Sequence, residues 1–267
     1  MGDIGELRQV FAESWDWTTG GEEWSDWFGG TPTLWYGTIL PRLRQFILPA
    51  STILEIAPGF GRVTQFLRPA CDHLVLVDLS PKCIEACKAR FPDDPAIEFH
   101  VNDGTSLDMV ADSSIDLAFS WDSLVHADRE VVEAYVAELA KKLTDEGVAF
   151  IHHSNGGEHR LAHKIAVQVP ERIRRPLVAR GALLDVYAWR STTITGEHVI
   201  AAARRAGLVC VSQELFTWEH GPFLTEAITV LARPGSKWDR PSAVRRNREF
   251  RRTVRTLAAL QGDKQSS

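Results

Sequence analysis

Two adjacent histidines, His152 and His153, end an apolar run in the stretch GVAFIHHSN, and Asp122 follows a second apolar run, IDLAFSW. An imidazole can accept a proton near neutral pH, and a carboxylate beside it can orient the ring or hold a metal ion. Successive strand residues point to opposite faces, so we expect one of the two histidines to reach a substrate first. His152 or His153 is therefore a candidate general base with Asp122 as its partner. The competing interpretations are a half-buried histidine bonded to the backbone and an aspartate that caps a turn.

A glycine-containing turn follows the first β-rich segment, where Gly59 and Gly61 lie in LEIAPGFGRV. Glycine at such a turn lets a ligand approach the backbone near helix amides. A dinucleotide-binding turn would carry a further glycine at position 64, which is threonine here and argues against NAD. Three acids end neighbouring segments, Glu55 before the turn, Asp78 in VLVDLS and Asp103 in VNDGTSL. Asp78 could accept both ribose hydroxyls of a nucleoside, and Asp103 could meet an adenine amino group.

In this order, the motifs resemble those of class I S-adenosylmethionine-dependent methyltransferases. The resemblance covers Ser51 to about Asn155 and departs at Ala57, where many members have the first glycine of the turn. It implies S-adenosylmethionine as the cofactor. The residues assigned to cofactor binding are Glu55, Ala57, Gly59, Gly61, Asp78, Leu79, Asp103, Gly104, Ser120 and Trp121. The alternative is a doubly wound domain that binds no methyl donor.

From residue 51 onward, short β-rich runs alternate with helical patterns, which predicts a mostly parallel α/β sheet with helices on both faces. The expected strands are TILEIA, HLVLVDL, IEFHVN, IDLAFSW, GVAFIHH, LVCVSQEL and EAITVLA, and the expected helices include 81–91, 129–143 and 195–206. No helical segment separates the last two strands, so we expect them to pair antiparallel. The result is a Rossmann-like, seven-stranded sheet with a reversed last strand, as the resemblance also implies.

Three parts of the chain surround or interrupt this pattern. Residues 1–50 carry five of the nine tryptophans and predict a helical or lid segment. The methyltransferase-like domain is expected at 51–234, with a long lid insertion at about 156–190. Residues 235–267 predict an arginine-rich helix and a disordered end, GDKQSS. The amino-terminal tryptophans could stack on sugar rings or form a dimer contact, so a homo-oligomer stays open.

Composition limits the classes of partner. The net charge of −5 gives no overall attraction to nucleic acid, although arginines cluster at 172–175 and 245–255. No apolar run is long enough to cross a membrane, and the first residues do not resemble a signal peptide, so we expect a cytoplasmic protein. The four cysteines do not form a metal-binding pattern and are expected to be reduced.

The polar residues after the fourth and fifth strands suggest the acceptor. A hydroxyl has a high pKa and benefits from a general base or a metal, whereas an amine needs less help. Asp122 and His126 follow the fourth strand, and His152 and His153 end the fifth. His126 could instead serve the following helix near its cap. A divalent metal such as Mg²⁺, held by Asp122, a histidine and a carboxylate from Glu219 or Glu226, stays an open alternative.

The carboxyl-terminal motifs FIHHSN, WRSTT and the tryptophan-glycine hairpin at 218–221 resemble bacterial methyltransferases that act on sugars and polysaccharides. This resemblance implies O-methylation of a sugar, oligosaccharide or glycolipid, and a place in polysaccharide biosynthesis. Two alternatives remain. The protein could methylate a small natural product on oxygen or nitrogen, or it could be a non-catalytic nucleoside-binding module. Base methylation of nucleic acid is disfavoured, because the fourth strand runs into SWDSL rather than an Asn/Asp-Pro-Pro-aromatic motif.

Overall fold

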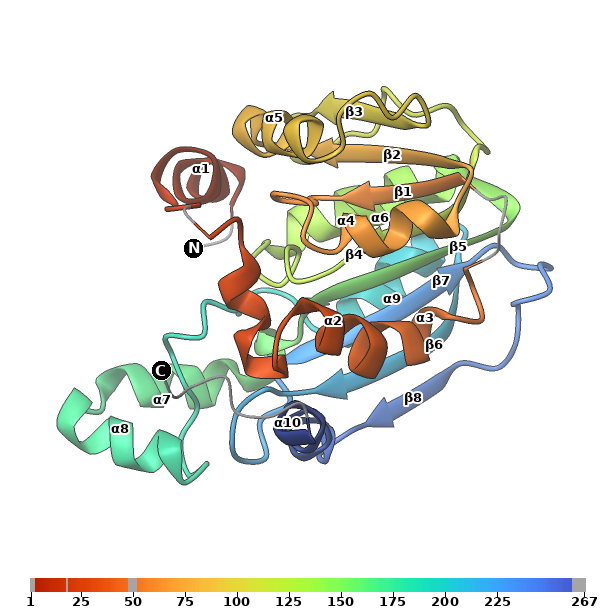
Figure 1. The fold of residues 1–267 in the computed structure, drawn as a ribbon. Coiled ribbons are helices and arrows are strands. Elements are labelled where there is room, and N and C mark those ends of the chain that lie inside the picture. Colours follow the sequence, from red (N-terminus) through yellow and green to blue (C-terminus); the bar gives the residue numbers. More distant parts are fainter. Residues whose placement is uncertain (1–2, 18, 48–51, 261–267) are drawn as a thin grey trace.

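One eight-stranded sheet runs through the computed structural model, which describes residues 3–17, 19–47 and 52–260 (Figure 1). The strand order is β3-β2-β1-β4-β5-β7-β6-β8. The strands are β1 (Thr52–Ile56), β2 (His73–Asp78), β3 (Ile97–Val101), β4 (Ile115–Ser120), β5 (Leu143–Ser154), β6 (Val209–Phe216), β7 (Glu226–Ala232) and β8 (Ala243–Arg246). Strands β1 to β5 pair in parallel, and β7 is antiparallel to both β5 and β6. The expected α/β sheet with a reversed β7 is confirmed.

The helices cover both faces of the sheet (Figure 1). They are α1 (Ile4–Leu7), α2 (Thr31–Leu34), α3 (Leu40–Leu43), α4 (Thr64–Leu67), α5 (Pro81–Arg90), α6 (Arg129–Lys142), α7 (Arg160–Gln168), α8 (Glu171–Ala179), α9 (Gly196–Arg205) and α10 (Phe250–Leu260). Shorter 3-10 turns span Glu22–Phe28, Arg68–Ala70 and Gly156–His159, and π-helical turns span Arg8–Ser14 and Trp35–Ile39. Helix α9 is capped at its amino terminus, because the Thr195 hydroxyl accepts the His198 amide at 3.1 Å.

Alternation along the strands divides the core into two layers. Leu54 and Ile56 of β1 face the layer that contains α6 and α9, whereas Ile53 faces the layer that contains α2, α3 and α10. The same alternation continues along β4, where Phe119 stacks on Phe150 of β5 with ring centroids 5.7 Å apart. Because both faces of the central strands are apolar, the centre of the sheet is buried between the two helical layers.

Two predictions about the carboxyl-terminal part need correction. The sheet has eight strands rather than seven, because Ala243–Arg246 add β8 in parallel beside β6. The expected helix of residues 235–267 therefore begins only at Phe250. All four residues of β8 are exposed, so this edge strand lacks the apolar alternation by which a strand is recognised in sequence. The GDKQSS end and the expected boundary at 50–51 lie outside the described residues.

The strand order reverses between β1 and β4, which pair as neighbours while their crossover connections run to opposite sides. In open α/β sheets a ligand binds at this point, beyond the carboxyl ends of the strands. The insertion after β5 forms the helical hairpin of α7 and α8, which projects from the body at the lower left of Figure 1. Among the described residues, no helix is both long and apolar enough to span a bilayer.

Candidate active site

The turn after β1 is built from left-handed backbone. Gly59 and Gly61 have φ angles of 59° and 77°, and Ala57 has a φ of 56°. An added Cβ at Gly59 would lie 3.2 Å from the Trp17 ring, so glycine is required there for two reasons. Ala57 shows that the glycine missing from the motif is replaced by an alanine in the same left-handed conformation, which an L-residue adopts at a cost of about 1–2 kcal/mol.

Two buried acids brace this turn. The Asp78 carboxylate accepts the Gly59 amide at 3.2 Å and the Ser80 amide at 2.8 Å, and Glu55 accepts the Thr64 hydroxyl at 2.6 Å. Burial raises the pKa of Asp78 to about 6, although its backbone hydrogen bonds act in the opposite direction. Burial likewise raises the pKa of Glu55 to about 7, against the lowering effects of Thr64 and Arg62.

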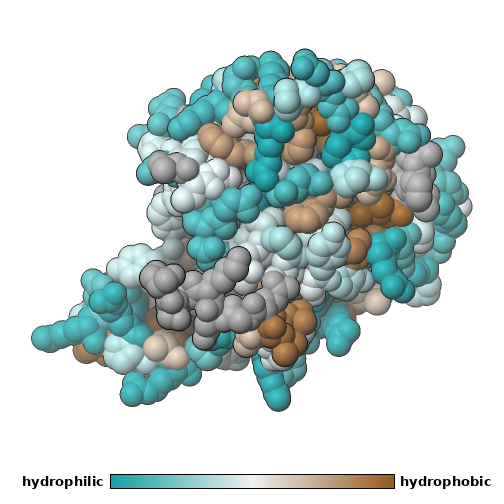
Figure 2. Space-filling view, viewed as in Figure 1, coloured by the Kyte–Doolittle hydropathy of each residue, from teal (hydrophilic) through white to brown (hydrophobic). Residues whose placement is uncertain are grey.

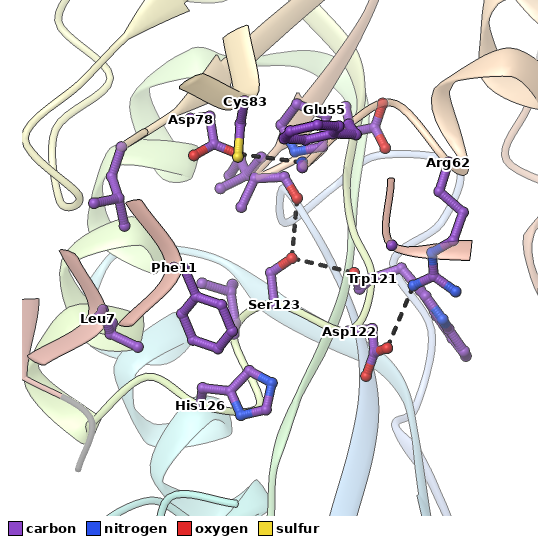
Figure 3. Close-up of a pocket in the computed structure, with 18 of the residues that line it drawn as sticks. Leu7, Phe11, Glu55, Arg62, Asp78, Cys83, Trp121, Asp122, Ser123 and His126 are labelled. Carbon is purple, nitrogen blue, oxygen red and sulfur yellow. Dashed lines mark hydrogen bonds and ion pairs between the residues drawn. The ribbon is translucent and has the colours of Figure 1, made fainter. Parts of the chain in front are cut away.

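These residues line a pocket at the carboxyl ends of β1, β2 and β4 (Figure 3). The amino-terminal segment covers it with Leu7, Phe11 and Trp17, and the Trp17 ring stacks on Phe60 at 4.6 Å. Apolar walls with a few polar groups are typical of a nucleoside-sized ligand site.

The cofactor residues expected from the sequence divide into two groups. Glu55, Ala57, Gly59, Asp78, Leu79, Gly104 and Trp121 line this pocket. Gly61 lies in the glycine turn after β1. Ser120 of β4 connects to the end of β1, because its hydroxyl donates to the Ile56 carbonyl at 3.1 Å. Tyr135 also lines the pocket and was not singled out by the sequence.

Asp103 is the exception, because its side chain is exposed and does not line the described pocket. One carboxylate oxygen accepts the amides of Thr105 and Ser106 at 2.8 and 2.7 Å. These hydrogen bonds lower the pKa of Asp103 to about 2. Asp103 thus forms the turn after β3 with one carboxylate oxygen, next to Gly104 at the pocket wall, and its role as an adenine ligand stays a prediction.

His152 is in the wrong place for a general base. Its side chain is fully buried, and its Nδ1 accepts the Asp122 amide at 3.1 Å. An Nδ1 that accepts leaves the proton on Nε2, which donates to Glu226 at 2.6 Å. Both ring nitrogens are thus committed inside the protein, and a substrate cannot reach either one.

His153 is also fully buried, on the opposite face of β5. Its Nδ1 donates to the Ser154 carbonyl at 2.9 Å, and its Nε2 accepts the Thr229 hydroxyl at 2.8 Å. Gln213 in turn donates to Thr229. Burial, the largest cause, lowers the pKa of His153 to about 4. The half-buried, backbone-bonded interpretation that the sequence left open is thus the correct one for both histidines, in a more deeply buried form.

A network of buried charges replaces the expected histidine-aspartate pair. Glu226 of β7 accepts from Arg190 at 2.7 Å and from His152 and Trp218. Burial alone would raise the pKa of Glu226, but Arg190 and His152 outweigh it and lower the pKa to about 2. Arg190 also lies 3.8 Å from Asp122, which makes it the cation between two acids.

Asp122 forms a second ion pair with Arg62, which follows the glycine turn and lies 3.3 Å from the Asp122 carboxylate (Figure 3). Arg62 also donates to the Ser25 hydroxyl at 2.6 Å, which ties the amino-terminal segment to the site. Asp122 itself has a φ of 60°, so the β4 turn, like the β1 turn, is in a left-handed conformation. The sequence singled out Asp122 but neither arginine, because arginines far apart in the chain carry no motif.

His126 is only partly buried and lines the pocket. Its Nδ1 donates to the Trp189 carbonyl at 2.6 Å, which leaves the lone pair on Nε2. The ring packs beside Phe11 with centroids 5.1 Å apart (Figure 3). Burial, the largest cause, together with Arg190, lowers the pKa of His126 to about 4, so the ring is neutral at physiological pH.

A second, larger groove adjoins the first pocket. Trp24, Trp121, Asp122 and His126 line both, so the two spaces meet at these residues. Six tryptophans line the groove, namely Trp15, Trp24, Trp27, Trp121, Trp189 and Trp218. Its polar residues include Asp185, Glu219 and Arg251. Burial and the charges of Asp185 and Glu226 raise the pKa of Glu219 to about 7.

The polar residues do not assemble into a metal site. Within residues 3–17, 19–47 and 52–260, no three histidine, cysteine, aspartate or glutamate side chains converge as ligands. Asp122 faces two arginines, and Glu226 is shared by Arg190 and His152. Because cations already neutralise these acids, the metal site suggested by the sequence does not form from them.

Comparison with known proteins agrees with this geometry. Residues 53–147 match the family model of a methyltransferase domain. Over 73 residues the chain is 30% identical to a ribosomal RNA small subunit methyltransferase A of Geobacter metallireducens. That match covers 27% of this chain and 26% of the relative, so it spans only about a quarter of the relative's length.

Solved structures share the arrangement of elements over most of the chain. A magnesium protoporphyrin IX methyltransferase from Synechocystis PCC 6803 with bound SAH superposes with a TM-score of 0.59 at 14% identity, covering 86% of this chain and 100% of that one. A SAM-dependent methyltransferase from Methanosarcina mazei gives 0.53 at 15% identity, covering 72% and 97%. At these identities the likeness shows a shared fold. Residues 53–147 of this chain thus match a methyltransferase domain, and most of the chain, up to 86%, shares the fold of solved methyltransferases.

Proposed function

We propose that this protein transfers a methyl group from S-adenosylmethionine to a hydroxyl of a sugar, an oligosaccharide or the sugar of a glycolipid. The observation that carries the proposal is the junction of the two spaces. The first pocket, which has an acid placed to accept ribose hydroxyls, opens into the tryptophan-lined groove at His126 and Asp122. Methyl transfer needs a donor site and an acceptor site that open onto each other in line.

The residues of the first pocket fit the cofactor. The left-handed Gly59 and Gly61 let a ligand approach the backbone, and Asp78 projects from the end of β2, where a carboxylate accepts ribose hydroxyls. Leu79 and Phe11 supply apolar walls for a base. S-adenosylmethionine, when bound, supplies a methyl group activated by its positively charged sulfur. The protein must then hold the acceptor in line and take up its proton.

His126 is the residue best placed to receive that proton. It lines both spaces, its Nε2 carries the free lone pair, and the Trp189 carbonyl fixes the ring through Nδ1. This arrangement replaces His152 and His153 in the role that the sequence suggested for them. Burial and Arg190 lower the pKa of His126, and the Asp122 carboxylate in the same turn partly opposes them by favouring positive charge on the ring.

The groove favours a carbohydrate acceptor. Flat aromatic rings can stack on the apolar faces of sugars, and charged side chains between them can bond to hydroxyl groups. Trp27 and Trp189 offer exposed rings, while Asp185, Glu219 and Arg251 supply polar atoms. Most of the tryptophans come from the amino-terminal segment and the insertion after β5, the parts outside the regular sheet.

Trp27→Ala should raise KM for the acceptor about tenfold, because one stacking ring contributes about 1–1.5 kcal/mol. Its side chain is 59% exposed, so the fold should not depend on it. The kinetic constants for the acceptor are measured at saturating cofactor. Tyr36→Ala is the matched control, since Tyr36 is 62% exposed and lies outside the described groove. An unchanged KM in Trp27→Ala would remove Trp27 from the acceptor site.

Affinity for S-adenosylmethionine should fall about tenfold per pH unit below about pH 6, because Asp78 must be ionised to accept ribose hydroxyls. Burial raises the pKa of Asp78 to about 6 in the empty site, so ionisation is lost on the acid side of that value. Calorimetry across the range from about pH 5 to 8 measures the effect. Asp78→Asn should bind weakly with little of this dependence, whereas Asp103→Asn should behave as wild type. Equal slopes in all three proteins would contradict the assignment.

An amine acceptor is the second candidate, favoured by the acids among the tryptophans. Asp185 and Glu219 beside aromatic rings could hold an ammonium group through charge and cation–π contacts. Release of the demethylated cofactor is followed with oligosaccharides and with small amines, each with and without a chelator. The proposal expects turnover of oligosaccharides that a chelator does not reduce. Turnover of amines alone would favour the second candidate, and binding of NAD in place of S-adenosylmethionine would exclude both.

A further inference from the structure

The helical hairpin of α7 and α8 exposes an unusual surface. Leu161 and Ile165 are 72% and 53% exposed, and their spacing of four residues places them on one face of α7. Val167 and Ile173 are also exposed, at 49% and 47%. Figure 2 shows the hairpin projecting from the body, with a few apolar residues between hydrophilic ones.

Charge on the hairpin is opposite to that of the whole chain. Residues 160–180 contain six basic side chains and one acidic side chain, whereas the chain carries a net charge of −5. The basic residues are Arg160, Lys164, Arg172, Arg174, Arg175 and Arg180, of which all but Arg174 are exposed. Exposed aliphatic side chains among basic ones are typical of helices that lie in the interface of an anionic membrane.

Arg174 of α8 connects the two helices of the hairpin. Arg174 is buried, and it donates to the carbonyls of Ala166 and Val169 at the end of α7, both at 3.4 Å. Its guanidinium also bonds to the Tyr187 hydroxyl and lies over that ring at 4.7 Å. The two helices therefore present their exposed side chains in a fixed arrangement.

The hairpin also adjoins the acceptor groove. Val178 and Ala179 of α8 line the groove, as do Tyr187, Ala188 and Trp189 from the segment that follows. A surface that receives α7 and α8 would therefore lie beside the groove. This position suits an acceptor that is presented at a membrane surface.

We propose that the α7–α8 hairpin docks this protein on anionic lipid bilayers, with Leu161, Ile165 and Ile173 entering the headgroup region and the neighbouring basic side chains facing anionic lipids. This inference goes beyond the proposed methyl transfer and does not depend on it. The binding is peripheral, through short amphipathic helices that lie in the plane of the interface.

Flotation of the full chain with vesicles tests the proposal. The wild type should bind vesicles of phosphatidylcholine mixed with phosphatidylglycerol, should bind pure phosphatidylcholine at least about tenfold more weakly, and should be released by high salt. The double variant Leu161→Glu with Ile165→Glu should lose at least about tenfold in binding to mixed vesicles. The double variant Arg160→Gln with Lys164→Gln should lose a smaller factor and become less sensitive to salt.

The double variant Val101→Glu with Val244→Glu is the matched control, because these residues are 47% and 55% exposed on the edge strands β3 and β8 and the two changes add the same charge. It should bind vesicles as the wild type does, and circular dichroism and thermal unfolding confirm that each variant is folded. Equal loss in the control and the hairpin variant would overturn the proposal. So would wild-type chain that binds RNA but no vesicles, or that forms dimers which only the hairpin variant abolishes.

Discussion

Replacing His126 by alanine should lower kcat by about 100-fold or more while the affinity for S-adenosylmethionine stays near that of the wild type. Nε2 of His126 is the accessible histidine lone pair at the junction of the two spaces, so its loss removes the proton acceptor and leaves Asp78 and the glycine turn intact. Steady-state kinetics and cofactor calorimetry measure the two quantities. His220→Ala is the matched control, because His220 is an exposed histidine at the same groove.

The pH profile separates His126 from Glu219, a second candidate base in the groove. The pKa of His126 is lowered to about 4, so its ring is neutral and ready to accept a proton throughout the neutral range. The kcat of the wild type should therefore change little between about pH 8 and about pH 5. The pKa of Glu219 is raised to about 7, and a base with that pKa would lose activity below neutrality. A tenfold loss per unit below about pH 7 would move the assignment from His126 to Glu219.

Glu226→Ala should lower the free energy of unfolding by about 3 kcal/mol, because it leaves the largely buried Arg190 without its closest carboxylate. The same change removes the acceptor for the His152 proton and for the Trp218 indole. Chemical denaturation measures the loss. Glu85→Ala is the control, since its pair with Lys88 is exposed and should contribute less than about 1 kcal/mol.

This comparison also tests the structural role of His152. A His152→Ala variant should lose stability together with Glu226→Ala in a non-additive way, since both belong to one network. If Glu226→Ala proved as stable as Glu85→Ala, the network would not hold β5, β7 and the insertion together.

Most of the sheet could be predicted from the sequence because its strands are buried on both faces and therefore appear as short apolar runs between turns. The turn at Gly59 and Gly61 and the acid Asp78 could be predicted for a related reason. They lie close together in the chain, and backbone geometry requires their residue types. Ala57 stands where the motif usually has glycine, and it still adopts the left-handed conformation of that glycine.

The acceptor side could not be assigned from sequence in the same way. The histidines at 152 and 153 stood out because they end an apolar run, yet that position is what buries them against β7. Whether a strand-end histidine faces a pocket depends on partners such as Glu226 and Thr229, which are more than 70 residues away. His126 lines the pocket and contacts the insertion through Trp189, a contact that no local pattern indicates.

The most direct test of the central claim is to identify the atom that receives the methyl group. S-adenosylmethionine with an isotope-labelled methyl group is incubated with the protein and an oligosaccharide panel, and the products are analysed by mass spectrometry and NMR. We expect the label as an ether on a sugar oxygen with the wild type and His220→Ala, and little or none with His126→Ala or Asp78→Asn. Label on nitrogen alone, or equal O-methylation by His126→Ala, would contradict the account.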